Sequence, residues 1–308
     1  MTNFFNMIRI VSFFSVLLLL SCGSNKLKSE EHNTPVLPSD SSVVISDSIF
    51  TGGIEGPAVG KNGDLFLVNI NHEGTIARKK FDNDSFNLFV ELPEGSIGNG
   101  IRFDKQGNMY VADYPKHNVL KIEYGTRQIE VYAHDSTMNQ PNDLAIMDNG
   151  IIFASDPNWA ESSGNLWRID KNGSFVLLED SMGTTNGIEV SPDNKILYIN
   201  ESIQRKVWAY DLNEKGEVSN KRLFKQFSDF GMDGMRCDNL GNLYIARYNA
   251  GVVAVLNPQG EIIRTVKLNG DKPTNIAFGG VKGDIVYVTM QGKKWVESFK
   301  SQFPGRNF

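Results

Sequence analysis

The sequence predicts an all-β fold built from six repeated units, and three observations support this prediction. A polar residue recurs six times at intervals of 42 to 47 residues, and each copy opens a short apolar run. A second apolar run ends 14 or 15 residues after each of these residues. Turns rich in Asp, Asn and Gly separate the two runs, and such turns suit tight hairpins. The six recurring residues are Glu55, Asn99, Asn142, Asn186, Asp233 and Asn275.

The length of the repeat fits one blade of a β-propeller. In the second copy, residues 100–104 and 109–113 read as the two inner strands, and 119–124 and 129–133 read as the two outer strands. Four strands in about 43 residues is the size of one propeller blade. We therefore expect a six-bladed β-propeller of four-stranded antiparallel blades over residues 43–300.

The sixth copy lacks a strand, which predicts how the ring closes. Its strands fall near residues 275–279, 285–290 and 294–299, after which the chain nearly ends. The apolar segment 42–50 stands before the first blade and can supply the fourth strand. Such an N-terminal strand would join the last blade and remove an open sheet edge. Residues 301–308 are then expected to form a C-terminal tail outside the blades.

The N-terminal segment predicts export. Arg9 precedes a mainly apolar stretch over residues 10–20, which is too short to span a bilayer and fits the apolar region of a signal peptide. The sequence Leu19-Leu20-Ser21-Cys22 resembles a bacterial lipobox. We expect residues 1–21 to be a lipoprotein signal peptide and Cys22 to carry the lipid. An ordinary secretory signal that happens to contain a cysteine is the alternative.

The segment after Cys22 predicts a tethered protein. Residues 22–42 are polar and contain two prolines, which is typical of a flexible tether. Gly23 in place of Asp favours the outer membrane, where the protein would face the periplasm or the outside. The only other cysteine is Cys237, so a lipidated Cys22 leaves no intramolecular disulfide. The membrane would be contacted through the lipid anchor alone.

Net charge and composition narrow the partners. The formal net charge is −5 and no long basic stretch is present, which argues against nucleic acid as a partner. Four histidines show no spacing for a zinc triad, and the sequence has no Gly-x-Ser-x-Gly elbow. We expect a monomer that acts on a small molecule.

The six recurring residues predict a metal site if the units surround one axis. Glu55 and Asp233 would bring two carboxylates to the axis, and the four Asn residues would bring amide oxygens. These hard donors suit Ca²⁺, with Mg²⁺, Mn²⁺ and Zn²⁺ as alternatives. Turn chemistry alone would explain Asn99 and Asn275. It does not explain Glu55, which beside Asp233 requires either a cation or a proton.

At this point the residues carry a family resemblance. The motifs Ile54-Glu55-Gly56-Pro57, Pro141-Asn142-Asp143, Thr185-Asn186-Gly187 and Met232-Asp233-Gly234 occur in order along the blades. Together they resemble the gluconolactonase and senescence-marker-protein (regucalcin) family of six-bladed propellers, over residues 50–300. The resemblance implies a catalytic divalent ion, usually Ca²⁺, and hydrolysis of a lactone, often a sugar lactone such as an aldonolactone.

The resemblance also implies roles for individual residues. It makes Glu55, Asn142, Asn186 and Asp233 the metal ligands, and it makes Asp233 the catalytic general base. Because a carboxylate bound to Ca²⁺ is a weakened base, direct nucleophilic attack by Asp233 stays open.

A second set of residues is predicted to shape substrate choice. The strands that end on the same rim as the recurring residues place further polar groups there, and Asn99 and Asn275 of the first set are also free to contact substrate. These side chains could instead pair with one another, Arg247 with an acidic neighbour. The expected substrate-binding residues are Asn99, Asp113, Asp156, Asn158, Trp159, Glu201, Arg247 and Asn275.

Two other functions fit the same sequence. One is a non-catalytic propeller that binds a ligand or a partner protein at the outer membrane. The other is a related hydrolase acting on phosphotriesters or aryl esters. Fold alone does not choose among these, because propellers host many unrelated functions. The two facing carboxylates Glu55 and Asp233 favour the metal-dependent lactone hydrolase, because a propeller that serves only as a scaffold has no reason to keep them.

Overall fold

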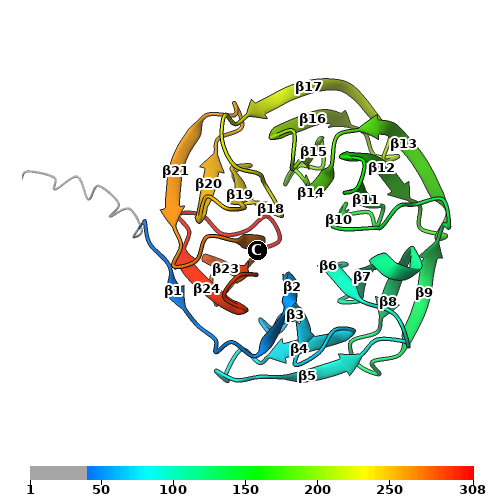
Figure 1. The fold of residues 1–308 in the computed structure, drawn as a ribbon. Coiled ribbons are helices and arrows are strands. Elements are labelled where there is room, and N and C mark those ends of the chain that lie inside the picture. Colours follow the sequence, from blue (N-terminus) through cyan, green and yellow to red (C-terminus); the bar gives the residue numbers. More distant parts are fainter. Residues whose placement is uncertain (1–39) are drawn as a thin grey trace, which may run out of the picture. The chain divides into compact units, whose positions relative to one another are not determined.

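A computed structural model describes residues 40–308 of the 308-residue chain. The predicted signal peptide, Cys22 and most of the predicted tether therefore lie outside the described residues. In the described part, no helix is long and apolar enough to cross a membrane. The chain there forms six four-stranded antiparallel sheets around a central channel, so the predicted six-bladed β-propeller is confirmed (Figure 1).

Each of the first three sheets follows one copy of the repeat from the channel outward. The first blade contains β2 (Phe50–Val59), β3 (Leu65–Ile70), β4 (Thr75–Lys79) and β5 (Phe86–Glu91). The second contains β6 (Gly98–Phe103), β7 (Met109–Asp113), β8 (Asn118–Ile122) and β9 (Ile129–His134), with the short 3₁₀ helix η1 (Tyr114–Lys116) after β7. The third contains β10 (Leu144–Ile146), β11 (Ile152–Asn158), β12 (Ser163–Ile169) and β13 (Phe175–Met182).

The other three sheets repeat this order. The fourth blade contains β14 (Thr185–Val190), β15 (Ile196–Glu201), β16 (Lys206–Leu212) and β17 (Val218–Gln226). The fifth contains β18 (Met235–Cys237), β19 (Leu243–Arg247), β20 (Val252–Leu256) and β21 (Ile262–Lys267). The sixth contains β22 (Pro273–Gly279), β23 (Ile285–Met290) and β24 (Trp295–Lys300), and its outer strand is β1 (Val43–Val44).

The N-terminal strand closes the ring as predicted, but it is shorter than the expected segment 42–50. Only Val43 and Val44 pair with β24, while Phe50 already begins β2. The closure is held by Glu297, whose side chain is fully buried. Its carboxylate accepts hydrogen bonds from Ser42 Oγ at 2.5 Å and from the Asn269 backbone N–H at 2.8 Å.

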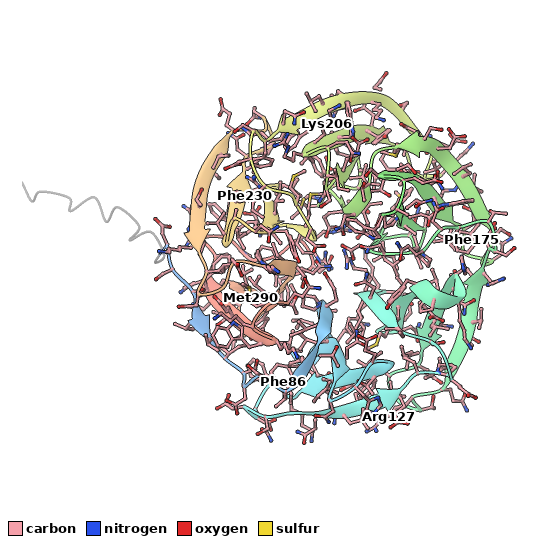
Figure 2. The ribbon with its side chains drawn as sticks, viewed as in Figure 1. Phe86, Arg127, Phe175, Lys206, Phe230 and Met290 are labelled. Atoms are coloured by element: carbon pink, nitrogen blue, oxygen red, sulfur yellow. The ribbon has the colours of Figure 1, made fainter. Side chains whose placement is uncertain are left out.

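The hydrophobic core lies between neighbouring blades rather than in the channel. Phe66 and Val68 of the first blade pack with Ile101, Met109 and Val111 of the second in one buried cluster. The inner strands of a blade are covered on both faces by the neighbouring blades. Strands such as β3 and β7 are therefore buried at every residue. Figure 2 shows the side chains that fill the spaces between the sheets.

The C-terminal tail, predicted to lie outside the blades, adds no strand but is held against the channel. Gly305 forms an isolated bridge with Asp238, and the Arg306 backbone N–H donates to the Cys237 carbonyl at 3.1 Å. The Arg306 side chain then enters the channel and donates to Glu189 at 2.8 Å. The tail therefore covers part of the mouth at which the innermost strands end.

Candidate functional site

The residues that begin the innermost strands meet at the other mouth of the channel. Five of the six recurring residues line one cavity of about 440 Å³ there. They are Glu55, Asn99, Asn142, Asn186 and Asp233. The sixth, Asn275, is buried behind them and its Nδ2 donates to Glu55 Oε2 at 3.0 Å.

The glycine after a recurring residue lets the next blade approach closely. A side chain at Gly56 would collide with the backbone carbonyl of Asn99, and Gly56 has a φ of +61°. Likewise, side chains at Gly187 and Gly234 would collide with the Asp233 carbonyl and the Asn275 side chain. The repeated residue–glycine pair thus sets the diameter of the ring, and Gly56 also suits a left-handed conformation.

The strand-end residues predicted to bind substrate hold this ring in place instead. Each bonds to the backbone two or three residues before a recurring residue. Asp113 accepts from the Ile97 N–H at 3.2 Å, and Asp156 accepts from the Gln140 N–H at 2.6 Å. Both carboxylates are fully buried and lie outside the lining of the cavity.

Glu201 and Arg247 follow the same rule in the fourth and fifth blades. Glu201 accepts from the Gly183 N–H at 3.0 Å, and Arg247 Nε donates to the Gly231 carbonyl at 3.3 Å. Arg247 also pairs with Asp229 at 2.8 Å, which matches the alternative of an acidic neighbour. We therefore assign Asp113, Asp156, Glu201 and Arg247 a positioning role in place of the predicted substrate contact.

The remaining predicted residues are divided between the cavity and the surface. Trp159 lines the cavity and its side chain is exposed, so it remains available to a substrate. Asn158 is absent from the lining, and its Oδ1 accepts from the Glu161 N–H at 3.2 Å. Asn275 acts on Glu55 rather than on the cavity, whereas Asn99 lines the cavity directly.

The two carboxylates of the ring repel each other in a partly buried setting. Burial raises the pKa of Glu55 to about 7, and the charge of Asp143 adds to this shift. Burial, followed by the charges of Glu55 and Asp143, raises the pKa of Asp233 well above its ordinary value. Hydrogen bonds from Asn186 and Asn275 oppose these two shifts but do not cancel them.

The donor set fits a hard divalent cation. Asn186 Oδ1 is buried and has no hydrogen-bond partner, although the side chain lines the cavity. An orphaned buried oxygen beside two carboxylates with raised pKa values is the environment that a cation relieves. In the described part of the chain, no cluster of three or more His, Cys, Asp or Glu side chains is placed to hold a metal. A site here must therefore use amide oxygens together with the two carboxylates.

Sequence reasoning did not single out several residues that line the cavity. Gln140 and Gln291 come from loops and Tyr114 from the short helix η1, and the composition of these segments carries no signal of a site. Glu73 adds a third carboxylate, and the lining contains no Lys, Arg or His. Every charged side chain in the lining is therefore acidic.

The network of ion pairs that fills the channel below the ring was also not predicted from the sequence. Asp143 is buried, and it pairs with Arg102 at 3.0 Å and with Arg236 at 3.5 Å. Burial raises the pKa of Asp143, but the two guanidinium groups outweigh it and hold the pKa below its usual value. Arg102, Glu189 and Arg236 each stand three residues after a recurring residue, which is the signal that could have revealed them.

Glu55 makes the stability of the metal-free protein depend on pH. The unfolded-state pKa is near the ordinary 4.5 and the folded-state pKa is about 7, so the native state binds more protons between these values. Stability is therefore greatest below pH 4.5 with respect to this group and falls as the pH rises through 7, by on the order of 3 kcal/mol. Urea denaturation in EDTA from pH 5 to 8 should show a steeper decline for the wild type than for Glu55→Gln. Parallel curves for the two proteins would contradict the assignment.

Fold and cavity together define a class: a propeller with a ring of oxygen donors at one mouth of its channel. The model of the SMP-30/gluconolactonase/LRE-like region matches residues 54–292. The chain belongs to this family, which confirms the family resemblance seen in the sequence.

Individual relatives agree with this assignment. Regucalcin of Xenopus laevis is 38% identical over 256 residues, covering 79% of this chain and 84% of the relative. A gluconolactonase of Zymomonas mobilis is 27% identical over 270 residues, covering 76% and 75% of the two chains. A crystal structure of a calcium-binding regucalcin from Agrobacterium tumefaciens superposes with a TM-score of 0.74 at 18% identity, covering 86% of this chain and 96% of that one.

Proposed function

We propose that this protein is a divalent-cation-dependent hydrolase that opens the ring of a neutral lactone, with Ca²⁺ as the cation and an aldonolactone as the substrate. The observation that carries the proposal is the meeting of Glu55, Asp233 and the unpartnered oxygen of Asn186 in one cavity. A relative named gluconolactonase supports the reaction, and a solved structure described as a calcium-binding regucalcin supports the ion.

The ring supplies the ligands for the cation. Glu55, Asn142, Asn186 and Asp233 come from four different blades and offer two carboxylates and two amide oxygens to the same cavity. Asn275 orients Glu55 through its hydrogen bond to Oε2. When bound, a divalent cation supplies positive charge that stabilises the oxyanion developing on the lactone carbonyl.

Asp233 is the residue that moves a proton. Its carboxylate lines the cavity, takes a proton from the water that attacks the carbonyl carbon, and returns that proton to the ring oxygen as the acyl carbon–oxygen bond of the lactone breaks. Burial and the charge of Glu55 raise the pKa of Asp233 in the metal-free protein, and a neighbouring cation would lower it again. Asn186 holds the carboxylate in place by donating a hydrogen bond to it.

The acidic lining selects an uncharged substrate. Glu73 faces the same cavity as Glu55 and Asp233, and no cationic side chain lines it. Trp159 and Tyr114 offer aromatic faces, and Gln140 and Gln291 offer amides that suit a polyhydroxylated ring. A phosphorylated lactone would meet a carboxylate with no cation of the protein to pair with.

A panel of lactones tests this function. A pH-indicator assay should show acid release from neutral aldonolactones and a loss of that rate in EDTA. We expect a 6-phosphorylated aldonolactone to give a kcat/KM about tenfold or more below that of its neutral parent, because like charges repel in a site of low dielectric constant. Glu73→Gln should reduce the difference in kcat/KM between the phosphorylated lactone and its neutral parent. The proposal fails if no lactone is opened, or if opening proceeds unchanged in EDTA.

We also propose that the protein is exported and anchored through a lipid on Cys22 to the outer membrane of a bacterium. The support is the Leu19-Leu20-Ser21-Cys22 sequence after an apolar segment, which lies outside the described residues. Metabolic labelling with a fatty-acid analogue checks this, and labelling of a Cys22→Ser variant as strong as that of the wild type would exclude it.

A further inference from the structure

A second cavity, unrelated to the proposed reaction, lies at the opposite mouth of the channel. It has a volume of about 640 Å³ and is bounded by the residues at which the innermost strands end, including Arg102, Ile146, Glu189 and Arg236. The C-terminal tail forms part of its wall through Arg306 and Phe308. None of its lining residues belongs to the cavity that holds Glu55 and Asp233.

Three arginines share two buried carboxylates beside this cavity. Asp143 pairs with Arg102 and Arg236, and Glu189 pairs with Arg236 at 3.8 Å and with Arg306 at 2.8 Å. Arg306 also lies 3.7 Å from the half-exposed Asp148. Arg102 and Arg236 are each only 8% exposed. The buried guanidinium groups of Arg102 and Arg236 therefore face two buried carboxylates, while Arg306 has a third carboxylate partner in Asp148, in a setting where water screens charge poorly.

The guanidinium groups are not fully satisfied by the protein. Arg102 Nε and Arg236 Nη2 are buried and have no hydrogen-bond partner in the structure. Burial and the nearby charge of Arg102 lower the pKa of Arg236 to about 10. A buried guanidinium N–H without a partner is unfavourable until an acceptor, such as the oxygen of an anion, approaches it.

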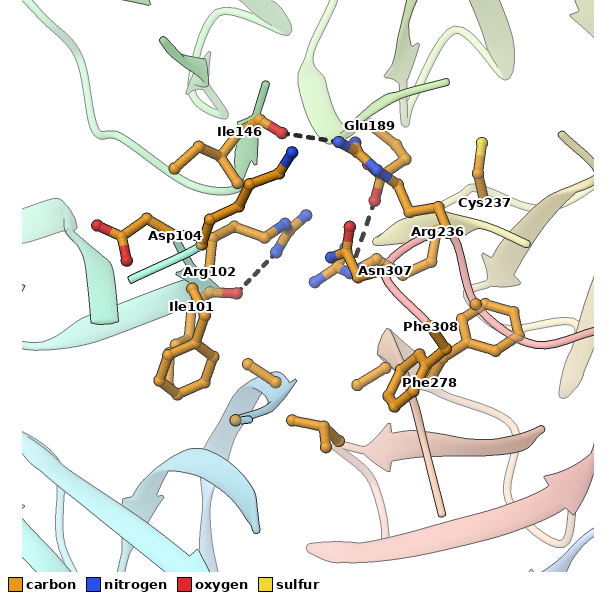
Figure 3. Close-up of a pocket in the computed structure, with 18 of the residues that line it drawn as sticks. Ile101, Arg102, Asp104, Ile146, Glu189, Arg236, Cys237, Phe278, Asn307 and Phe308 are labelled. Carbon is orange, nitrogen blue, oxygen red and sulfur yellow. Dashed lines mark hydrogen bonds and ion pairs between the residues drawn. The ribbon is translucent and has the colours of Figure 1, made fainter. Parts of the chain in front are cut away.

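The rim adds charge, and the wall adds apolar surface. Lys61 is exposed at the rim and makes no ion pair within residues 40–308, whereas Lys105 is paired with Asp148 at 3.0 Å. Figure 3 shows the Arg102 guanidinium directed toward the middle of the cavity and the rings of Phe278 and Phe308 on one side of it. The cavity thus offers cations at its floor and rim and an aromatic wall between them.

We propose that this cavity binds a small organic oxyanion with a compact apolar body, whose negative head lies against Arg102 and Arg236 and whose body lies against Phe278. A carboxylate and a phosphate monoester share the required head, and planar guanidinium groups pair well with both. Lys61 contributes long-range attraction from the rim.

Binding of benzoate, benzamide and inorganic phosphate tests the proposal. Titrations at low ionic strength should use protein that has been treated with EDTA and then dialysed, so that no cation at the other mouth can hold a carboxylate and no EDTA competes for the cavity. Benzoate has both the oxyanion and the apolar ring, benzamide has the ring but no charge, and inorganic phosphate has the charge but no apolar group. The variants are Arg236→Gln and Lys61→Gln, with Lys293→Gln as a matched control because Lys293 is exposed and lies outside the lining.

We expect benzoate to bind with higher affinity than either benzamide or inorganic phosphate. Loss of a charge-assisted contact should weaken benzoate about tenfold or more in Arg236→Gln and a few-fold in Lys61→Gln, with no change in Lys293→Gln. Equal binding of benzoate and benzamide, absence of saturable benzoate binding, or an unchanged affinity in Lys61→Gln would overturn the proposal. If Arg236→Gln fails to fold, judged by circular dichroism, Lys61→Gln decides the question alone. Tighter phosphate than benzoate would contradict the role of the aromatic wall.

Discussion

Asp233→Asn should lower kcat for lactone opening by about 10²- to 10⁴-fold, the usual contribution of a general base. The substitution keeps an oxygen at the same position but removes the proton acceptor. It also removes the carboxylate whose pKa is raised by burial and by the charge of Glu55. We therefore expect the metal-free variant to be at least as stable as the wild type. Initial rates by pH indicator, together with urea denaturation, measure both effects.

The control for this variant is Glu73→Gln, which removes a carboxylate from the same cavity but outside the ring. It should retain the rate with a neutral lactone within a few-fold. Near-normal turnover by Asp233→Asn with the cation bound would show that Asp233 does not act as the base. Trapping of an acyl-enzyme on Asp233 in the wild type would instead assign it the role of nucleophile.

Asp143→Asn should destabilise the fold by about 3–5 kcal/mol, because it leaves two buried guanidinium groups without their shared carboxylate. Asp143 Oδ1 lies 3.0 Å from Arg102, and Oδ2 lies 3.5 Å from Arg236. An amide of the same shape removes the charge while leaving the packing nearly unchanged. Equilibrium denaturation in urea measures the loss as a shift of the midpoint at constant slope.

A surface ion pair provides the comparison for Asp143. Asp211 pairs with Arg222 at 2.7 Å, and both side chains are nearly half exposed. Asp211→Asn should leave the midpoint close to that of the wild type, since exposed pairs contribute little. A small effect of Asp143→Asn, similar to that of Asp211→Asn, would mean that the channel network does not stabilise the fold.

Much of the fold could be predicted from the sequence because it depends on a repeat. The spacing of Glu55, Asn99 and Asn142 reports the size of a blade, and six equivalent positions around one axis must converge. The missing fourth strand of the last copy likewise predicts the closing strand. Its length could not be predicted, because apolar residues from 42 to 50 serve two blades, and only β1 belongs to the last one.

The sequence predicts a site residue correctly where the symmetry of the repeat places it in the cavity. It does not do so where the direction of the side chain determines whether the residue lines the cavity. Asp113 ends β7 and Asp156 lies near the end of β11, both at the expected rim, but their carboxylates bond to backbone N–H groups of the preceding connections and so lie outside the cavity. The charges below the ring were missed for a different reason. Arg102 and Arg236 look like ordinary exposed strand residues until the inner strands meet and bury them around Asp143.

We propose that Glu55 and Asp233 together hold one divalent cation at the mouth of the channel. Calorimetric titration of Ca²⁺ into the EDTA-treated and dialysed protein at pH 7 tests it most directly, with Glu55→Gln as the comparison. We predict saturable binding at a single site in the wild type, with release of protons from the carboxylates whose pKa values are raised. The variant should bind at least about tenfold more weakly, because it loses one of the two charges facing the ion. No saturable binding by the wild type, or equal affinity in Glu55→Gln, would contradict the account.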